Sequence, residues 1–377
     1  MSTDERARAW VDVSPSALQE NLQTIRKSVG PEVRILPMVK ADAYGLGVKE
    51  AFGALEPMDP WGYGVAAVEE GLELREIGAS RPILICSPVP MESYIDAVES
   101  GLTPSVSDLD GLLALRTACR DLGRRARFHL EIDTGIGRAG LDWRRVAEWG
   151  PKLDDIVDSS LIWEGCYTHF HSADGLDEGS LDDQWRRLQE TVARLPSRPG
   201  ASFVHACNSP GALRRADLAG DMVRPGIFLY GGVAGAGLPA PTPVASLRAR
   251  IVLLKEASPG STVGYGSTHT ASGPERWATA AIGYGDGLPR LLGNLGEGVV
   301  RGKRAPIIGR ISMDVTVLDV TGVPDTGLGD VVTFFGRSEG EEISVEEVAD
   351  HAQTINYEIL TGLTRRVPRI WTDDVGY

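Results

Sequence analysis

The sequence of 377 residues predicts an α/β protein: a (β/α)8 barrel of the TIM type followed by a mostly-β C-terminal domain. Two observations support this fold class. Eight short apolar runs occur between residues 33 and 230, and most are separated by segments with helical spacing of apolar residues. A Gly/Pro-rich segment follows at residues 235–243, and strands and turns prevail after it. We therefore assign residues 1–240 to the barrel and residues 241–377 to the second domain.

The elements follow in order along the chain. The eight barrel strands are predicted at residues 33–39, 62–67, 82–86, 102–106, 127–132, 161–168, 202–205 and 223–230. Helices are predicted at residues 17–25, 68–77, 112–122 and 184–195. The second domain has predicted strands at residues 247–254, 277–282, 305–309 and 330–335, and one clear helix at residues 345–353. A doubly wound sheet is the alternative fold, whereas a barrel places its chemistry just after each strand.

Composition narrows the class of protein further. The chain carries 38 basic and 52 acidic residues, so its net charge of −14 disfavours nucleic acid and anionic membranes as partners. No apolar run approaches the length of a membrane span, and the N-terminus is polar. The four cysteines have no CxxC spacing, which indicates reduced thiols of a cytoplasmic protein, with neither a disulfide frame nor a metal site.

Lys40 stands out because it ends an apolar strand and begins the Gly-containing segment KADAYGLG. A strand-end lysine commonly just extends its amine to solvent. This chain contains only six lysines, however, and Lys40 lies where a barrel carries its catalytic groups. A desolvated lysine has a lowered pKa and can act as a Schiff-base nucleophile or as a base.

The segment TGIGRAG at residues 134–140 contains the pattern G-x-G-x-x-G. A dinucleotide-binding fingerprint belongs to the first βα unit, whereas this segment follows the fifth strand. We interpret the loop instead as a flexible turn that presents Arg138 to an anion.

Further polar residues follow the later strands. His169 ends the sixth strand, although a histidine there is more often structural than functional. Arg224 lies within the apolar eighth strand and needs an acceptor, because an unpaired buried guanidinium is costly. Ser209, Gly226 and Ile227 come after strands seven and eight, where barrels commonly bind phosphate.

Nine short motifs follow one another along the chain: VKADAYG, HLEIDTGIGRAG, EGCYTHF, HACNS, MVRPGI, GYGST, GYGDG, GRISMD and TINYE. Together they resemble those of the alanine racemases, pyridoxal-phosphate (PLP) enzymes with a (β/α)8 barrel and a β-rich C-terminal domain. The resemblance runs from about residue 8 to residue 371. The resemblance implies a cytoplasmic isomerase that interconverts L- and D-alanine by two-base proton transfer through a PLP aldimine. It also implies a homodimer with shared active sites.

The resemblance assigns roles to individual residues. Lys40 binds PLP covalently and is the base on one face of the substrate, and Tyr265 of the partner subunit is the opposite base. Arg224 binds the pyridine nitrogen of PLP and is held by His205. The other cofactor-binding residues are Tyr44, His169, Asn208, Ser209, Gly226, Ile227 and Tyr357. Substrate-binding residues are Arg138 and Met313; supporting residues are Glu131, Tyr284, Asp314 and the access-channel residues Arg290 and Arg310.

Two positions depart from the family pattern. Where the family usually has a lysine that is often carbamylated, this chain has Glu131, which supplies a carboxylate directly. Strand alternation puts Glu131 and Asp133 on one face of the fifth strand, and the following glycines turn the chain back, so one of the two can approach Arg138. We expect Glu131 to orient the Arg138 guanidinium; the alternative is that Glu131 is a solvated charge at the end of the strand. Leu46 stands where the family commonly has a histidine, and it removes a polar group near Tyr44.

Other functions fit parts of the pattern. A racemase of serine or another small amino acid, or a PLP decarboxylase of the same fold, shares most motifs, although Tyr265 after a glycine favours racemisation. A non-enzymatic PLP-carrier protein is built from the barrel alone, so Tyr265 and Met313 argue against it. A barrel hydrolase without a cofactor is the third alternative, and the visible absorption of bound PLP distinguishes it.

Overall fold

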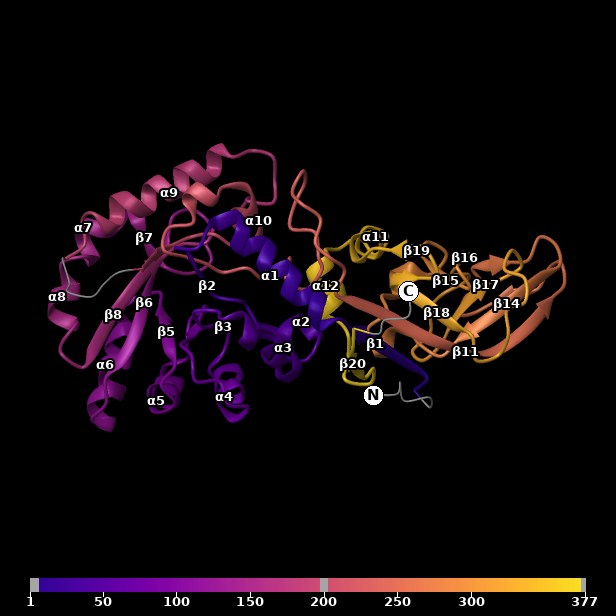
Figure 1. Ribbon diagram of the computed structural model, residues 1–377, viewed down its shortest axis with the longest axis horizontal. Coiled ribbons are helices and arrows are strands. Elements are labelled where there is room, and N and C mark those ends of the chain that lie inside the picture. Colours follow the sequence, from indigo (N-terminus) through magenta and orange to yellow (C-terminus); the bar gives the residue numbers. More distant parts are fainter. Residues whose placement is uncertain (1–6, 197–202, 374–377) are drawn as a thin grey trace.

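The computed structural model describes residues 7–196 and 203–373, and Figure 1 shows two domains side by side along its long axis. The domain coloured indigo to pink contains the parallel strands and most of the helices, and the orange and yellow domain contains mainly strands. Among the described residues, no helix is long and apolar enough to cross a membrane.

The barrel consists of eight parallel strands in a ring. They are β2 (Arg34–Ile35), β3 (Tyr63–Val65), β4 (Ile83–Ile85), β5 (Thr103–Val106), β6 (Ala126–Asp133), β8 (Leu161–Tyr167), β9 (Phe203–His205) and β10 (Met222–Val223). One sheet runs in the order β3-β4-β5-β6-β8-β9, and β10 pairs with β2. A parallel bridge between Met38 and Gly64 joins the β2 segment to β3, and Asp221 N, just before β10, donates to Val204 O of β9. These links close the ring, so the predicted barrel is confirmed over a doubly wound sheet.

The predicted eighth strand was too long. β10 ends at Val223, and the segment from Gly226 to Tyr230 forms consecutive turns, with Leu229 N donating to Gly226 O. Its side chains are nevertheless almost fully buried, which explains why this apolar run resembled a strand. The predicted seventh strand began at residue 202, which lies outside the described residues.

Helices surround the strands on the outside, as an amphipathic pattern requires. They are α1 (Pro15–Val29), α3 (Val48–Leu55), α4 (Val68–Glu76), α5 (Tyr94–Glu99), α6 (Leu109–Leu122), α7 (Val146–Trp149), α8 (Lys152–Ile156), α9 (Gly179–Val192) and α10 (Ser209–Arg214). The four predicted helices correspond to α1, α4, α6 and α9. The Ser14 hydroxyl caps α1 by accepting from Ala17 N at 3.1 Å, and Pro15 occupies the first turn. The short α2 (Lys40–Gly45) and β7 (Leu141–Asp142) lie at the carboxyl ends of β2 and β6.

The second domain is built on the long strand β11 (Ala245–Ala257), which pairs with three other strands. The remaining strands are β12 (Thr262–Val263), β13 (His269–Thr270), β14 (Glu275–Ala280), β15 (Glu297–Val300), β16 (Lys303–Pro306), β17 (Thr316–Asp319), β18 (Val331–Ser338), β19 (Glu341–Ile343) and β20 (Arg369–Trp371). Its helices are α11 (Val345–His351), which was predicted, and α12 (Asn356–Thr361), which was not. The predicted mostly-β character is confirmed.

The first strand of the chain precedes the barrel but lies in the second domain. β1 (Ala9–Val13) pairs antiparallel with β11 and parallel with β20, so it belongs to the sheet of the second domain. The buried Asp12 forms an ion pair of 2.6 Å with Arg248 of β11. The assignment of residues 1–240 to the barrel took no account of this long-range pairing. We propose a boundary near residue 240 for the part of the chain after β1.

Candidate active site

A cavity of about 330 Å³ lies at the carboxyl ends of the barrel strands. Its lining consists of Met38, Lys40, Tyr44, Cys86, Arg138, Tyr167, His169, Asn208, Ser209, Arg224, Gly226, Ile227 and Tyr357. Every residue predicted to bind the cofactor is in this lining except His205, and Arg138 accompanies them. The tertiary fold therefore brings together motifs from the ends of several strands, with Tyr357 added from helix α12 of the second domain.

The cavity is electropositive although the chain is acidic. Lys40, Arg138 and Arg224 line it, and none of the described residues in its lining is a carboxylate. The chain as a whole carries a net charge of −14. Burial, together with these three cations, lowers the pKa of His169 to about 3, so this imidazole is neutral at physiological pH. Such a cavity suits a ligand with negatively charged groups.

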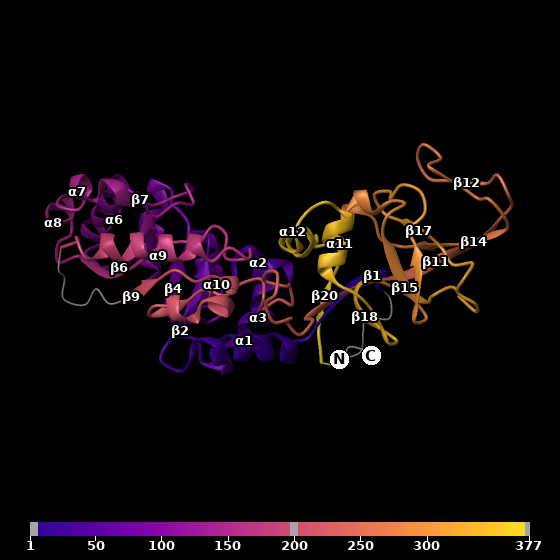
Figure 2. The same ribbon diagram turned by 90° about the horizontal axis from the view of Figure 1, so that it is seen from above.

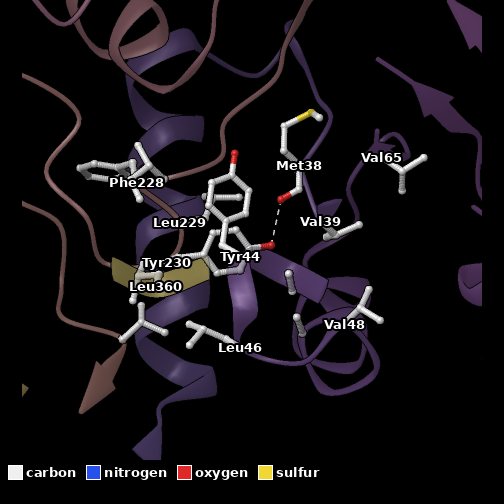
Figure 3. Packing of buried hydrophobic residues seen from close by; sticks show 14 of the residues in the cluster. Met38, Val39, Tyr44, Leu46, Val48, Val65, Phe228, Leu229, Tyr230 and Leu360 are labelled. Carbon is white, nitrogen blue, oxygen red and sulfur yellow. Dashed lines mark hydrogen bonds between the residues drawn. The ribbon is translucent and has the colours of Figure 1, made fainter. Parts of the chain in front are cut away.

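Lys40 stands at the start of an unusual backbone segment. The next four residues, Ala41 to Tyr44, have φ between +51° and +57°, in the left-handed region. The Tyr44 ring stacks on Tyr230 with centroids 4.6 Å apart, and the Tyr230 hydroxyl donates to Met38 O at 2.9 Å, as Figure 3 shows. Burial raises the pKa of Tyr44 well above its usual range, so its hydroxyl stays protonated.

Gly226 leaves space for the Tyr44 hydroxyl. A Cβ atom added to Gly226 would lie 2.0 Å from the Tyr44 hydroxyl oxygen, which no real contact permits. Beside this contact, the Ser209 hydroxyl accepts from Gly226 N at 2.8 Å and from Phe228 N at 3.4 Å. The Asn208 side chain accepts from Gly211 N and lies 3.4 Å from His169 Nε2. This end of the cavity is therefore lined by hydroxyl and amide groups.

Arg224 is almost fully buried, and hydrogen bonds hold its guanidinium in place. Its Nη1 lies 2.6 Å from His205 Nδ1, and its Nη2 donates to Thr168 O at 2.9 Å. Burial and the adjacent Arg224 hold the pKa of His205 well below its ordinary value, so Nδ1 is the acceptor. His205 Nε2 in turn lies 2.9 Å from His129 Nδ1. His205 thus stands behind Arg224, which explains its absence from the cavity lining.

Glu131 is buried, with an exposed fraction of 2%, and it is not a solvated strand end. Its carboxylate accepts from the Ser107 hydroxyl at 2.8 Å. No ion pair joins Glu131 to Arg138 among the residues that the structure describes. Asp133 instead fixes the loop before Arg138, because its side chain accepts from Gly135 N and Gly137 N. Any effect of Glu131 on Arg138 therefore acts through charge at longer range.

The other predicted residues lie apart from this cavity. Tyr265, Tyr284, Arg290, Arg310, Met313 and Asp314 all belong to the second domain and do not line it. Tyr265 is 72% exposed, in a turn between two glycines with positive φ. Figure 2 shows β12, which precedes this turn, at the end of the second domain that points away from the barrel. Tyr284 and Met313 lie close together, since Gly285 N donates to Met313 O. Both side chains are about half exposed.

Three lining residues were missed by sequence reasoning. The cavity is also lined by Met38, Cys86 and Tyr167, which lie at the ends of their strand segments. Their position at a strand end is the sequence feature that could have identified them. The Tyr167 ring stacks on His205 with centroids 5.0 Å apart, and the Arg224 guanidinium lies 4.8 Å from its centroid. Among the described residues its buried hydroxyl has no hydrogen-bond partner.

A second cavity of about 450 Å³ adjoins the first and shares His169, Asn208 and Tyr357 with it. Residues of both domains line it, including Asp174 from the barrel and Ile355 just before α12. The two predicted access-channel residues, Arg290 and Arg310, are not among the residues that line it.

Comparisons with known proteins agree with this arrangement. Residues 13–234 match the model for the alanine racemase N-terminal domain, and residues 244–371 match that for the C-terminal domain. The alanine racemase of Halothermothrix orenii is 36% identical over 371 residues and covers 97% of both chains. That of Geobacter sulfurreducens is 37% identical over 368 residues and covers 96% of both chains.

Solved structures show the same relationship. The alanine racemase from Streptomyces coelicolor A3(2) superposes with a TM-score of 0.91 at 32% identity, over 99% of this chain and 100% of that chain. The alanine racemase from Bartonella henselae, a structure with covalently bound pyridoxal phosphate, gives a TM-score of 0.88 at 28% identity, over 97% and 100%. Both domains of this chain are thus matched by one group of enzymes, and the chain belongs to the alanine racemase family.

Proposed function

We propose that this protein interconverts L- and D-alanine with PLP as its cofactor, in the cytoplasm, as a homodimer whose active sites are shared between subunits. The observation that carries the proposal is the cavity in which Lys40 lies with Arg138 and Arg224 and no carboxylate. The relatives described above are alanine racemases over their full lengths, which supports the choice of reaction.

The residues of the cavity fit PLP. A lysine amine is the group that binds its aldehyde, and the hydroxyl and amide groups of Tyr44, Ser209 and Gly226 suit its phosphate. The Tyr44 hydroxyl can lie beside these groups because Gly226 has no side chain to displace it. Arg224 also lines the cavity and suits the ring nitrogen. When bound, PLP makes the α-hydrogen of the amino acid acidic enough to be removed.

Arg224 controls how strongly the ring withdraws electrons. A guanidinium keeps its proton at every relevant pH, so Arg224 would donate a hydrogen bond to the ring nitrogen of bound PLP without transferring its proton. The neutral His205, 2.6 Å away, and the Thr168 carbonyl fix its orientation. A ring nitrogen that stays unprotonated limits side reactions such as transamination.

Inversion at the α-carbon needs a proton acceptor on one face and a donor on the other. The Lys40 amine supplies one face. The Tyr265 hydroxyl supplies the other face. Its side chain is 72% exposed, so it can reach the active-site cavity of a second subunit. We therefore infer that Tyr265 and the backbone of Met313 complete the partner's site, while Arg138 binds the substrate carboxylate within its own chain.

Glu131 and Leu46 bear on the choice of substrate. Glu131 supplies a buried carboxylate, whereas a lysine must first react with carbon dioxide to carry one, and the Ser107 hydroxyl donates to this carboxylate. Leu46 is fully buried in the core, and its carbonyl accepts from the Trp371 indole at 3.0 Å. Its side chain therefore packs in the core and does not line the cavity, which leaves alanine as the proposed substrate.

Two measurements test the proposal. Borohydride reduction followed by peptide mapping should place a pyridoxyl group on Lys40, and a label on Lys49 instead would refute the cofactor assignment. A chiral assay against a panel of L-amino acids should show the highest kcat/KM for alanine. Faster turnover of serine would assign the protein to another racemase activity, and decarboxylation without inversion would assign it to the decarboxylases.

A further inference from the structure

The segment after Lys40 is a left-handed turn built largely without glycine. Ala41, Asp42, Ala43 and Tyr44 all have φ above +50°. L-residues avoid this region because Cβ crowds the following carbonyl oxygen. Four such residues in series persist only where surrounding groups hold each peptide in place, and such conformations cluster at functional sites. The direction in which the Lys40 side chain leaves the backbone depends on this turn.

The end of the turn is held by the second domain. Arg369 Nε donates to Gly45 O at 2.8 Å, and Trp371 Nε1 donates to Leu46 O at 3.0 Å. The chain passes so close to Leu360 that a Cβ on Gly45 would lie 2.4 Å from the Leu360 carbonyl oxygen. Figure 3 shows Leu360 beside Tyr44 and Leu46 in this packing. These contacts act four or more residues away from Lys40.

A side chain of helix α4 binds the start of the turn. Glu70 Oε1 accepts from Ala41 N at 2.6 Å. That N–H belongs to the peptide that joins Lys40 to Ala41, so the bond orients the plane from which the lysine departs. Glu70 Oε2 accepts from Ala66 N at 2.7 Å and from Ala67 N at 3.3 Å, which ties the same carboxylate to the loop after β3.

Helix capping explains the two bonds to Glu70 Oε2 but not the bond to Oε1. Glu70 is the third residue of α4, where a glutamate commonly accepts from the residue before the helix. Oε2 already performs that task through Ala66 and Ala67. Oε1 contributes nothing to the cap and binds the catalytic turn instead. Glu69 is exposed in the same helical turn and carries the same charge, so it provides a matched control.

From this geometry we propose that Glu70 is a positioning residue for Lys40, acting through the peptide that follows the lysine. The proposal rests on the proposed function of Lys40. Glu70→Gln replaces one carboxylate oxygen by an NH2 donor, which cannot accept from both Ala41 and the loop after β3. Loss of a hydrogen bond to a charged acceptor at this point should lower kcat by between about tenfold and a hundredfold. The KM for alanine should stay within about twofold, because Arg138 is untouched.

The test compares Glu70→Gln with Glu69→Gln in the PLP-loaded enzyme. We expect the fall in kcat, and faster amide hydrogen exchange within residues 41–47, only in Glu70→Gln. Equal kcat and equal exchange in the two variants would overturn the proposal, as would faster exchange confined to α4. If Glu70→Gln does not fold, Glu70→Asp keeps the charge and the helix cap but is too short to span both partners, and the same two results are expected of it.

The exchange measurement also separates this proposal from the proposed function. A wild-type protein without racemase activity, or without a label on Lys40, would refute the function. The exchange of residues 41–47 would still report whether Glu70 holds the turn.

Discussion

Mixing two inactive variants tests whether the active site is shared between subunits. Lys40→Ala removes the lysine from the barrel cavity, and Tyr265→Ala removes the tyrosine from the exposed turn after β12. No single chain brings the two residues together, since Tyr265 does not line the cavity and is 72% exposed. In a dimer with twofold symmetry each site uses Lys40 of one chain and Tyr265 of the other. A hybrid dimer therefore has one site with both changes and one site with neither.

The size of the recovery follows from this geometry. Random exchange at equal concentrations makes about half of the dimers hybrids, and about half of the sites in each hybrid are intact. The mixture should therefore regain about a quarter of the wild-type activity, while each parent alone has no intact site. If each chain held a complete site of its own, every site would carry one change and the mixture would regain nothing.

The assay follows D-alanine formation after subunits with different affinity tags have exchanged. Native mass spectrometry measures the fraction of hybrids, and mixing two differently tagged Lys40→Ala chains gives the background. A preparation with the expected share of hybrids and no activity above this background would refute the shared site.

Three further predictions concern single residues. Gly226→Ala should weaken PLP binding at least about tenfold in a spectrophotometric titration, because its Cβ would lie 2.0 Å from the Tyr44 hydroxyl oxygen; unchanged affinity would refute the fit of the cofactor. Glu131→Gln should raise the KM for alanine about tenfold, and activity should not respond to bicarbonate between about pH 7 and 9; an unchanged KM would show that the charge is not needed. Burial lowers the pKa of His129 in the folded protein. Below about pH 6.5 the imidazole therefore binds a proton in the unfolded chain before it does so in the folded one. The free energy of unfolding should then fall with falling pH, by up to about 1.4 kcal/mol per pH unit for this residue. Urea unfolding at two pH values should show a smaller fall for His129→Gln, and an equal fall would contradict this.

The order of strands and helices could be predicted from the sequence because it depends on local patterns. Apolar runs of four to eight residues mark buried parallel strands, and apolar residues at helical spacing mark the helices between them. The position of Lys40 at the end of its strand then follows from barrel geometry, which gathers strand ends at one face. The motifs around Arg138, His169, Ser209 and Arg224 were placed on the same face for this reason, and they line one cavity.

Where each strand or helix ends, and which sheet a strand joins, depended on tertiary packing that local sequence patterns do not show. The apolar segment after Val223 was predicted as strand but forms buried turns, because burial alone does not distinguish the two. Strand β1 joined the sheet of the second domain through pairing with β11, whose residues lie more than 200 positions away. Helix α12 carries Tyr357 to the cavity, and its six residues are too few to show a clear period.

By itself the sequence determined which residue types stand at the ends of the barrel strands, because a strand and the loop after it are neighbours along the chain. Only the tertiary structure decided which distant groups hold them. Ser107 binds Glu131, His129 lies behind His205, and Glu70 binds the peptide after Lys40. The tertiary structure also separated Tyr265 from the cavity of its own chain. These relations are distances between segments far apart in the sequence, and such distances are set by how the whole chain packs rather than by any local pattern.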